Sequence, residues 1–174
     1  MIDLAALIRN VPDFPKPGVQ FKDITTLLLH PDAFHQIISI WEERYTPLNL
    51  DAIVGVDARG FIFGATLAYA MKVPFALARK KGKLPADTII EEFSLEYGTD
   101  NVEMHRDAIK PGQRVIVVDD LLATGGTAAA VVRLVNRLGG EVVESTFVVE
   151  LPPLGGRENL APTPVHSLVT FMVD

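Results

Sequence analysis

Short and long apolar runs alternate along this chain, which predicts strands alternating with helices. Short apolar runs predict buried strands at 52–56, 74–78, 115–118, 142–149 and 166–173. Longer runs with helical spacing predict helices at 30–45, 61–71 and from Thr127 onward. Because each later helix returns the chain to a new strand, we predict an α/β domain with a central, mainly parallel sheet flanked by helices.

Two segments interrupt this alternation. Residues 1–11 predict a short helix with Asp3 as its cap, and the prolines and glycine of 13–25 predict an irregular loop packed on the core. Farther along, 91–98 and 101–106 predict two strands joined by a Gly-Thr-Asp-Asn turn. A hairpin inserted between two parallel units is expected to be an exposed lid rather than part of the core.

Composition narrows the class of protein. The chain has 174 residues, of which 48% are hydrophobic and 22% charged, so we predict one globular domain spanning 1–174. A net charge of −6 argues against a nucleic-acid-binding coat, and the lack of cysteine excludes disulfides, thiol nucleophiles and cysteine-bound metals. With no signal-like N-terminus and no apolar run that could span a bilayer, the expected location is the cytoplasm, without membrane contact.

The clearest candidate site follows the strand at 115–118. Asp119 and Asp120 come directly after it, and the turn at 124–127 opens the next helix. A glycine-containing turn at a helix N-terminus suits a phosphate, whereas two carboxylates suit hydroxyl groups or a cation. Together they indicate a sugar phosphate, because the carboxylates would repel a simple anion. The alternative, which fits each residue singly, is a solvated turn with Thr124 as the helix cap.

A second polar turn, at 57–60, also ends a predicted strand. Because the carboxyl ends of parallel strands share one edge of a sheet, we expect Arg59 to lie near Asp119. The alternative is a surface arginine paired with Asp57. The basic cluster at 79–83 is either a solvated face or a surface that neutralises a pyrophosphate.

Four segments, in order, resemble those of known enzymes. The sequence at 115–127, VIVVDDLLATGGT, is similar to the phosphoribosyl-pyrophosphate signature of the type I phosphoribosyltransferases. Residues 14–24, the turn at 57–60 and the sequence SLEYG at 94–98 are similar to the base-binding segment, the pyrophosphate loop and the catalytic loop of adenine phosphoribosyltransferases. The resemblance therefore covers nearly the whole chain.

This resemblance implies a fold and a function. It implies the type I phosphoribosyltransferase fold, with an N-terminal base-binding hood at 1–30 and a mobile β-hairpin lid at 80–106. It also implies purine salvage: the 5-phosphoribosyl group passes from phosphoribosyl pyrophosphate to adenine, giving AMP and pyrophosphate, through an oxocarbenium-like transition state with Mg²⁺. The implied partners are these two substrates and a second copy of the chain in a homodimer; no nucleic acid and no membrane are expected.

The resemblance assigns roles to individual residues as well. The positions implied for the ribose 5-phosphate are Asp119, Asp120, Ala123, Thr124, Gly125, Gly126 and Thr127. Those for pyrophosphate are Asp57, Ala58, Arg59, Lys80 and Lys83, with a cis peptide bond between Asp57 and Ala58. Those for adenine are Gln20, Phe21 and Lys22, and those for catalysis are Glu96, Arg59 and Tyr97. Mg²⁺ is expected to be held mainly through substrate oxygens, with no direct protein ligand.

One position departs from the family pattern, because Lys22 stands where arginine is common. In the family, the phenylalanine matching Phe21 stacks on the purine, and backbone groups at the positions of Gln20 and Lys22 pair with its edge. If the backbone binds the base here too, the departure matters little. If the side chain binds it, adenine affinity is affected.

Three other functions fit parts of the sequence. A phosphoribosyltransferase for another base would keep the signature at 115–127 but not the segment at 14–25 or SLEYG. A regulatory protein could bind phosphoribosyl pyrophosphate without catalysis, although it would be expected to add a nucleic-acid-binding module and a basic face. A dinucleotide-binding module would want G-x-G-x-x-G after a strand, which the sequence lacks.

Overall fold

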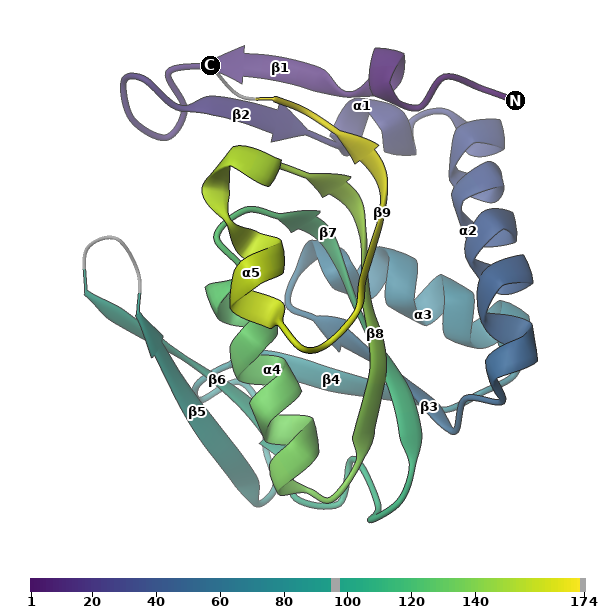
Figure 1. Ribbon diagram of the computed structural model, residues 1–174, viewed down its shortest axis with the longest axis vertical. Coiled ribbons are helices and arrows are strands. Elements are labelled where there is room, and N and C mark those ends of the chain that lie inside the picture. The colour runs from purple at the N-terminus through teal and green to yellow at the C-terminus, as the bar shows by residue number, and fades with distance from the viewer. Residues whose placement is uncertain (95–97, 173–174) are drawn as a thin grey trace.

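The computed structural model describes residues 1–94 and 98–172 of the chain. Within these residues a seven-stranded sheet carries helices on both faces, and a separate two-stranded hairpin lies along one of its edges (Figure 1). The predicted α/β domain with a central, mainly parallel sheet is therefore confirmed.

The large sheet has a parallel centre and one antiparallel side. Its strand order is β5 (Thr88–Ser94), β6 (Thr99–His105), β4 (Phe75–Lys80), β3 (Ala52–Val56), β7 (Arg114–Leu122), β8 (Glu141–Glu150) and β9 (Val165–Thr170). Pairing is parallel from β4 through β9 and antiparallel where β6 joins β4 and β5. Because β3 and β7 are parallel neighbours, their carboxyl ends meet at one edge of the sheet.

Side chains alternate between the two faces of each strand, which divides the core into two layers. Ile53 of β3 packs with α2 (Pro31–Tyr45) and α3 (Arg59–Met71), whereas Ala52 and Val54 pack with α4 (Gly126–Arg137). The short α5 (Gly156–Leu160) lies beside α4 (Figure 1). The remaining short elements are η1 (Ala5–Leu7), α1 (Thr25–Leu28), η2 (Thr46–Leu48) and η3 (Pro152–Leu154).

The N-terminal segment differs from its prediction. Where a helix and an irregular loop were expected, a single 3₁₀ turn, η1, precedes two antiparallel strands, β1 (Arg9–Pro12) and β2 (Gln20–Asp23). Pairing across this hairpin satisfies the hydrogen bonds of its backbone N–H and C=O groups. At its open end, the side chain of Arg9, the first residue of β1, donates to that of Asp23, the last residue of β2. The hairpin lies along the edge where the parallel strands end (Figure 1).

The inserted hairpin of β5 and β6 is also more than the predicted exposed lid. One face of it belongs to the core, because Ile89, Phe93, Val102 and Met104 are buried in the same cluster as α4. In addition, β6 begins at Thr99, so three of the four residues of the predicted Gly-Thr-Asp-Asn turn are part of the strand. The mobility expected of 80–106 remains a prediction.

The central strand is longer than the apolar run that predicted it. We expected the two aspartates to end it, but β7 continues through them to Leu122, because its partner β8 remains paired up to Glu150. The acidic pair is thus held in a strand rather than in a turn. Among the described residues, none of the helices combines the length and the apolarity needed to cross a membrane.

The anchor of the N-terminal hairpin generates a pH prediction. Hydrogen bonds from Arg9 and then Thr25 lower the pKa of Asp23 from 3.8 to about 2. Folding thus favours the ionised form of Asp23. The contribution of this carboxylate to the free energy of unfolding is therefore complete above the pKa that Asp23 has in the unfolded chain, and it is lost as the pH falls through about 2. We expect Asp23→Asn to lower the free energy of unfolding at neutral pH by roughly 1 kcal/mol, a value that allows for solvent screening at the exposed Arg9.

Urea unfolding at several pH values measures this difference between variant and wild type. The difference is expected to shrink as the pH falls toward about 2. Asp107→Asn, at an exposed turn position, is the matched control and should follow the wild type throughout. A difference for Asp23→Asn that stays constant across the whole pH range would contradict the assignment.

Candidate active site

The ends of β3 and β7 bring the two predicted polar turns together. Gly60, at the start of α3, packs so closely on β7 that a Cβ atom there would lie 2.7 Å from the carbonyl oxygen of Val118 and 2.9 Å from Oδ1 of Asp119. Only glycine permits this approach without displacement of a backbone. The close contact fixes Arg59 beside the acidic pair, as the shared sheet edge predicted.

Two ion pairs join the elements around this edge. Nε of Arg59 donates to Oδ2 of Asp120 at 2.5 Å, and Nε of Arg79 donates to Oδ2 of Asp57 at 3.0 Å. The alternative pairing of Arg59 with Asp57 is therefore wrong: Asp57 faces β4, whereas Arg59 reaches across to β7. The peptide bond between Asp57 and Ala58 is cis, as the resemblance implied.

Burial and like charge make Asp119 unusual. Burial, and then the negative charge of Asp120, raise the pKa of Asp119 well above its ordinary value. Burial disfavours the charged form of Arg59, yet its hydrogen bond to Asp120 and the charges of both aspartates outweigh that effect and raise its pKa. The protein therefore holds Arg59 firmly in its protonated form, whereas it disfavours the ionised form of Asp119. The carboxyl group of Asp119 can hydrogen-bond to a neutral hydroxyl.

A small cavity lies over the glycine loop, the name used here for residues 123–127. The cavity has a volume of about 100 Å³ and is lined by the whole loop together with Asp119. Gly125 has a φ of 80°, which favours glycine, and α4 begins at Gly126. The unpaired N–H groups and the positive end of a helix dipole therefore face this cavity, which suits a phosphate.

A second cavity, of about 170 Å³, also borders Asp119. It is lined by Asp57 and Arg79, by Lys80 and by the start of β6 at Asp100 and Asn101. Lys80 also approaches Asp100, with 3.6 Å between Nζ and Oδ2. We call this the basic cavity after its arginine and lysine, which suit an anion; Asp57, Asp100 and Asp119 also line it.

Both cavities share Asp119 and Thr127 among their lining residues. A molecule with an anionic group at each end would therefore place its middle beside Asp119. Hydroxyl groups are the partners that suit carboxylates at that point. The geometry thus fits a sugar with a phosphate at one end and a second phosphate group at the other.

A buried carboxylate shapes the basic segment that follows β4. Glu103 of β6 is 3% exposed, and its Oε1 accepts hydrogen bonds of 3.0 Å from the backbone N–H groups of Lys83 and Leu84. Burial would raise the pKa of Glu103, but these backbone bonds lower it overall. Of the two predicted lysines, Lys80 lines the basic cavity, whereas Lys83 is exposed on the loop that Glu103 holds.

The N-terminal hairpin presents Phe21 to the acidic pair. The guanidinium carbon of Arg59 lies 5.7 Å from the centre of the Phe21 ring, and Phe14 packs edge-on to that ring at 5.2 Å. Side chains of neighbouring residues point to opposite faces of a strand, and Lys22 accordingly points elsewhere. Its Nζ donates to Oδ1 of Asn10 at 2.8 Å and lies 4.7 Å from the ring centre of Phe171.

Several predicted residues fall outside these contacts. Glu96 and Tyr97 lie outside the described residues, so their placement stays a prediction. The side chain of Gln20 accepts a hydrogen bond from Asn10 on the same face as Lys22. Within the described ranges, 1–94 and 98–172, no group of three or more acidic, histidine or cysteine side chains is arranged to hold a metal ion.

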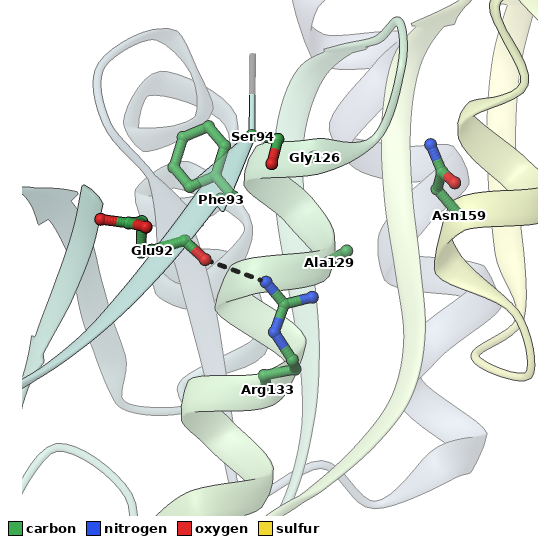
Figure 2. Close-up of a pocket in the computed structure, with 7 residues that line it drawn as sticks. All are labelled: Glu92, Phe93, Ser94, Gly126, Ala129, Arg133 and Asn159. Carbon is green, nitrogen blue, oxygen red and sulfur yellow. Dashed lines mark hydrogen bonds between the residues drawn. The ribbon is translucent and has the colours of Figure 1, made fainter. Parts of the chain in front are cut away.

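No motif in the sequence predicted that α5 belongs to this region. Asn159 of α5 donates from Nδ2 to the carbonyl oxygen of Thr124 at 2.6 Å, and Gly156 packs directly on the glycine loop. Figure 2 shows Asn159 on α5 and Gly126 and Ala129 on α4; these residues, with Phe93 and Arg133, line a cavity of about 340 Å³. The glycine pair at 155–156 was the only local signal, and it fits an ordinary turn equally well.

Comparisons with known proteins agree on one family. A model described as the phosphoribosyl transferase domain matches residues 23–161. The adenine phosphoribosyltransferase of Chloroflexus aurantiacus is 56% identical over 169 residues, which cover 97% of this chain and 98% of that protein.

Solved structures give the same result. The adenine phosphoribosyltransferase of Thermoanaerobacter pseudethanolicus has a TM-score of 0.93 and 48% identity, covering 97% of this chain and 98% of its own. The Saccharomyces cerevisiae enzyme, complexed with adenine and an imino-altritol 1,6-bisphosphate, has a TM-score of 0.90 and 40% identity, covering 95% of this chain and 96% of its own.

The acidic pair generates a prediction of opposite effects from two matched substitutions. Asp119→Asn removes a like charge but keeps an oxygen that can accept the N–H of Asp120, a bond of 2.8 Å. We expect it to raise the free energy of unfolding by roughly 1 kcal/mol at neutral pH. Asp120→Asn removes the charge that holds Arg59 and is expected to lower that free energy by about 1 kcal/mol.

Denaturant unfolding without ligands measures both effects. The gain for Asp119→Asn should narrow as the pH is lowered, because wild-type Asp119, with its raised pKa, takes up a proton early and loses the repulsion. Equal destabilisation by the two substitutions would show that like charge is not what distinguishes Asp119.

Proposed function

Since the chain belongs to the adenine phosphoribosyltransferase family, we propose that it transfers the 5-phosphoribosyl group of phosphoribosyl pyrophosphate to adenine, giving AMP and pyrophosphate in purine salvage. The observation that carries the proposal is that two cavities, one over the glycine loop and one lined by Arg79 and Lys80, share Asp119 and Thr127 among their lining residues. Phosphoribosyl pyrophosphate has a phosphate and a pyrophosphate on opposite sides of one ribose. Its shape therefore fits the two cavities and Asp119, which borders both.

In this proposal the glycine loop binds the 5′-phosphate, with Ala123 to Thr127 supplying backbone N–H groups at the start of α4. Asp119 and Asp120 bind the ribose hydroxyls. The raised pKa of Asp119 supports this role, because such a carboxyl group is a ready hydrogen-bonding partner of neutral groups. The acidic pair also lies where positive charge would develop on the sugar.

The pyrophosphate occupies the basic cavity in this proposal. Arg79 and Lys80 line that cavity, the backbone at Asp57 and Ala58 borders it, and Arg59 lies at the acidic edge. Departure of pyrophosphate leaves negative charge on the leaving group, so cationic groups fixed in place lower the barrier. The exposed Lys83 can add to this charge from the loop held by Glu103.

Mg²⁺ fits the site as a cation that arrives with the substrate. The carboxylates of Asp57 and Asp120 are already paired with arginines, and Mg²⁺ is commonly bound through substrate phosphates with few carboxylate ligands. Held through pyrophosphate and ribose oxygens, it would neutralise charge on the leaving group. The protein residues then serve to bind the polyanion and orient it.

Adenine is proposed to bind between the N-terminal hairpin and the acidic edge. Phe21 faces Arg59 there and offers a ring on which a purine can stack. The side chain of Lys22 points to the opposite face, which supports binding of the base by backbone groups of Gln20 and Lys22. The bound adenine that is named for the yeast relative supports this choice of base.

The chemical step is proposed to be displacement of pyrophosphate from the anomeric carbon by a nitrogen of adenine. The bond from that carbon to oxygen breaks as the new carbon–nitrogen bond forms, and the purine gives up a proton. Glu96 is proposed to assist that proton transfer, while Tyr97 and the hairpin keep water out. The end of β5 supports this placement, since a Cβ atom at Gly126 would lie 3.4 Å from the carbonyl oxygen of Ser94.

We also propose that the protein works as a homodimer in the cytoplasm. Exposed apolar side chains support a dimer, because Ile62 and Tyr69 lie on the outer surface of α3 and are 40% and 86% exposed. This helix begins at the Arg59 turn, so a partner seated there would lie close to the site. Analytical ultracentrifugation would give the mass of two chains, whereas a single-chain mass at micromolar concentration would contradict the dimer.

The test of the reaction is product formation with Mg²⁺ and phosphoribosyl pyrophosphate, with adenine, hypoxanthine, guanine and orotate in separate assays. AMP and pyrophosphate from adenine alone are expected. The acceptor that binds the exocyclic amine of adenine would be left without a donor when a base with an oxo group occupies the site. This loss costs roughly 1–3 kcal/mol of binding free energy. Turnover of another base would overturn the substrate assignment, and binding without any turnover would favour the regulatory alternative.

The hairpin geometry generates a prediction about base affinity. Phe21→Ala removes the stacking ring and is expected to raise KM for adenine about tenfold or more, with little effect on KM for phosphoribosyl pyrophosphate. Lys22→Met is expected to change KM for adenine by less than about twofold, because its side chain faces Asn10 and Phe171. Steady-state kinetics with each substrate varied in turn measure both. A large effect of Lys22→Met would show that the side chain contacts the base.

A further inference from the structure

The helix α5 forms the back wall of the glycine loop. A Cβ atom at Gly156 would lie 2.3 Å from the carbonyl oxygen of Ala123, and one at Gly125 would lie 2.6 Å from the carbonyl oxygen of Gly156. Two backbones can approach this closely only because both positions are glycine. Any shift of α5 would therefore move the glycine loop with it.

A side-chain hydrogen bond from α5 also orients one peptide group of the glycine loop. Nδ2 of Asn159 donates to the carbonyl oxygen of Thr124 at 2.6 Å. That carbonyl belongs to the same planar peptide unit as the N–H of Gly125, and in a trans peptide the two groups point in opposite directions. Holding the carbonyl toward α5 thus turns the N–H of Gly125 away from α5, toward the cavity over the loop.

The helix is itself anchored to the sheet. Nε and Nη2 of Arg157 donate to the two carboxylate oxygens of Glu150 at 3.0 and 2.5 Å, and Nη1 donates to the carbonyl oxygen of Val165 at 2.7 Å. Glu150, at the end of β8, is 3% exposed and also accepts a hydrogen bond of 2.5 Å from Ser167. The carboxylate thereby ties α5 to both β8 and β9. Rigid support of this kind is what an anion site made of backbone N–H groups requires.

We propose that α5 positions the glycine loop for the 5′-phosphate and that Asn159 is a positioning residue, acting on the phosphate through the Thr124–Gly125 peptide. The inference rests on the proposed function. It adds a role for α5, which acts on the substrate through the glycine loop. Figure 2 shows where Asn159 on α5 and Gly126 at the start of α4 lie. The side chain supports the loop from behind.

The test compares kinetic constants and binding for Asn159→Ala. Because the 5′-phosphate is remote from the anomeric carbon, KM for phosphoribosyl pyrophosphate is expected to rise about fivefold or more, with kcat within about twofold. KM for adenine should stay within about twofold, since the loop does not contact the base. Calorimetric titration with ribose 5-phosphate should show a dissociation constant raised by about the same factor as KM. Asn159→Gln keeps the amide donor and is expected to recover most of the lost affinity.

Asn136→Ala is the matched control, because Asn136 is an exposed asparagine on the last turns of α4. It is expected to match the wild type in every constant. Wild-type enzyme that binds ribose 5-phosphate but does not turn over adenine would refute the proposed function and leave the binding comparison as the test of Asn159. Unchanged constants for Asn159→Ala would overturn the inference. Equal increases in KM for both substrates together with a lowered melting temperature would overturn it too, since they indicate a general structural effect.

Discussion

The parallel pairing of β3 with β7 brings together two polar segments that are far apart in the chain. Arg59 and Asp120 are separated by 61 residues, yet they form an ion pair because the two strands end at the same edge. Gly60 makes the approach possible, since any side chain there would strike β7. The glycine loop and the basic cavity both border Asp119, the neighbour of Asp120 in β7.

The balance of charge around this edge explains how an acidic chain can bind a polyanion. Arg59 and Arg79 each bind an aspartate, and Lys80 approaches Asp100, so the cations are held in place before a ligand arrives. Preorganised charge of this kind needs little rearrangement when the leaving group develops its negative charge. Asp119 is different, because burial and Asp120 oppose its ionisation. In the proposed function, the site thus presents cations to the phosphates and a carboxyl group that resists ionisation to the ribose hydroxyls.

The sequence predicted local features well and tertiary partners poorly. The acidic pair, the glycine loop and the Arg59 turn were identifiable because each is a short segment whose chemistry lies in consecutive residues. The shared sheet edge also predicted that Arg59 lies near the acidic pair, but the choice of Asp120 over Asp57 as its partner depends on side-chain directions that periodicity does not specify. Pairing of β1 with β2 and the buried face of the inserted hairpin escaped prediction because periodicity does not specify which elements are neighbours. The support from α5 was the least predictable, because a hydrogen bond from Asn159 to a backbone carbonyl leaves no pattern in the sequence.

The most direct test of the account is a crystal structure with ribose 5-phosphate, pyrophosphate and Mg²⁺ bound together. The account predicts the 5′-phosphate on the glycine loop, the pyrophosphate beside Arg79 and Lys80, and the ribose hydroxyls on Asp119 and Asp120. Binding of both anions in the same cavity, or a ribose turned away from Asp119, would contradict it.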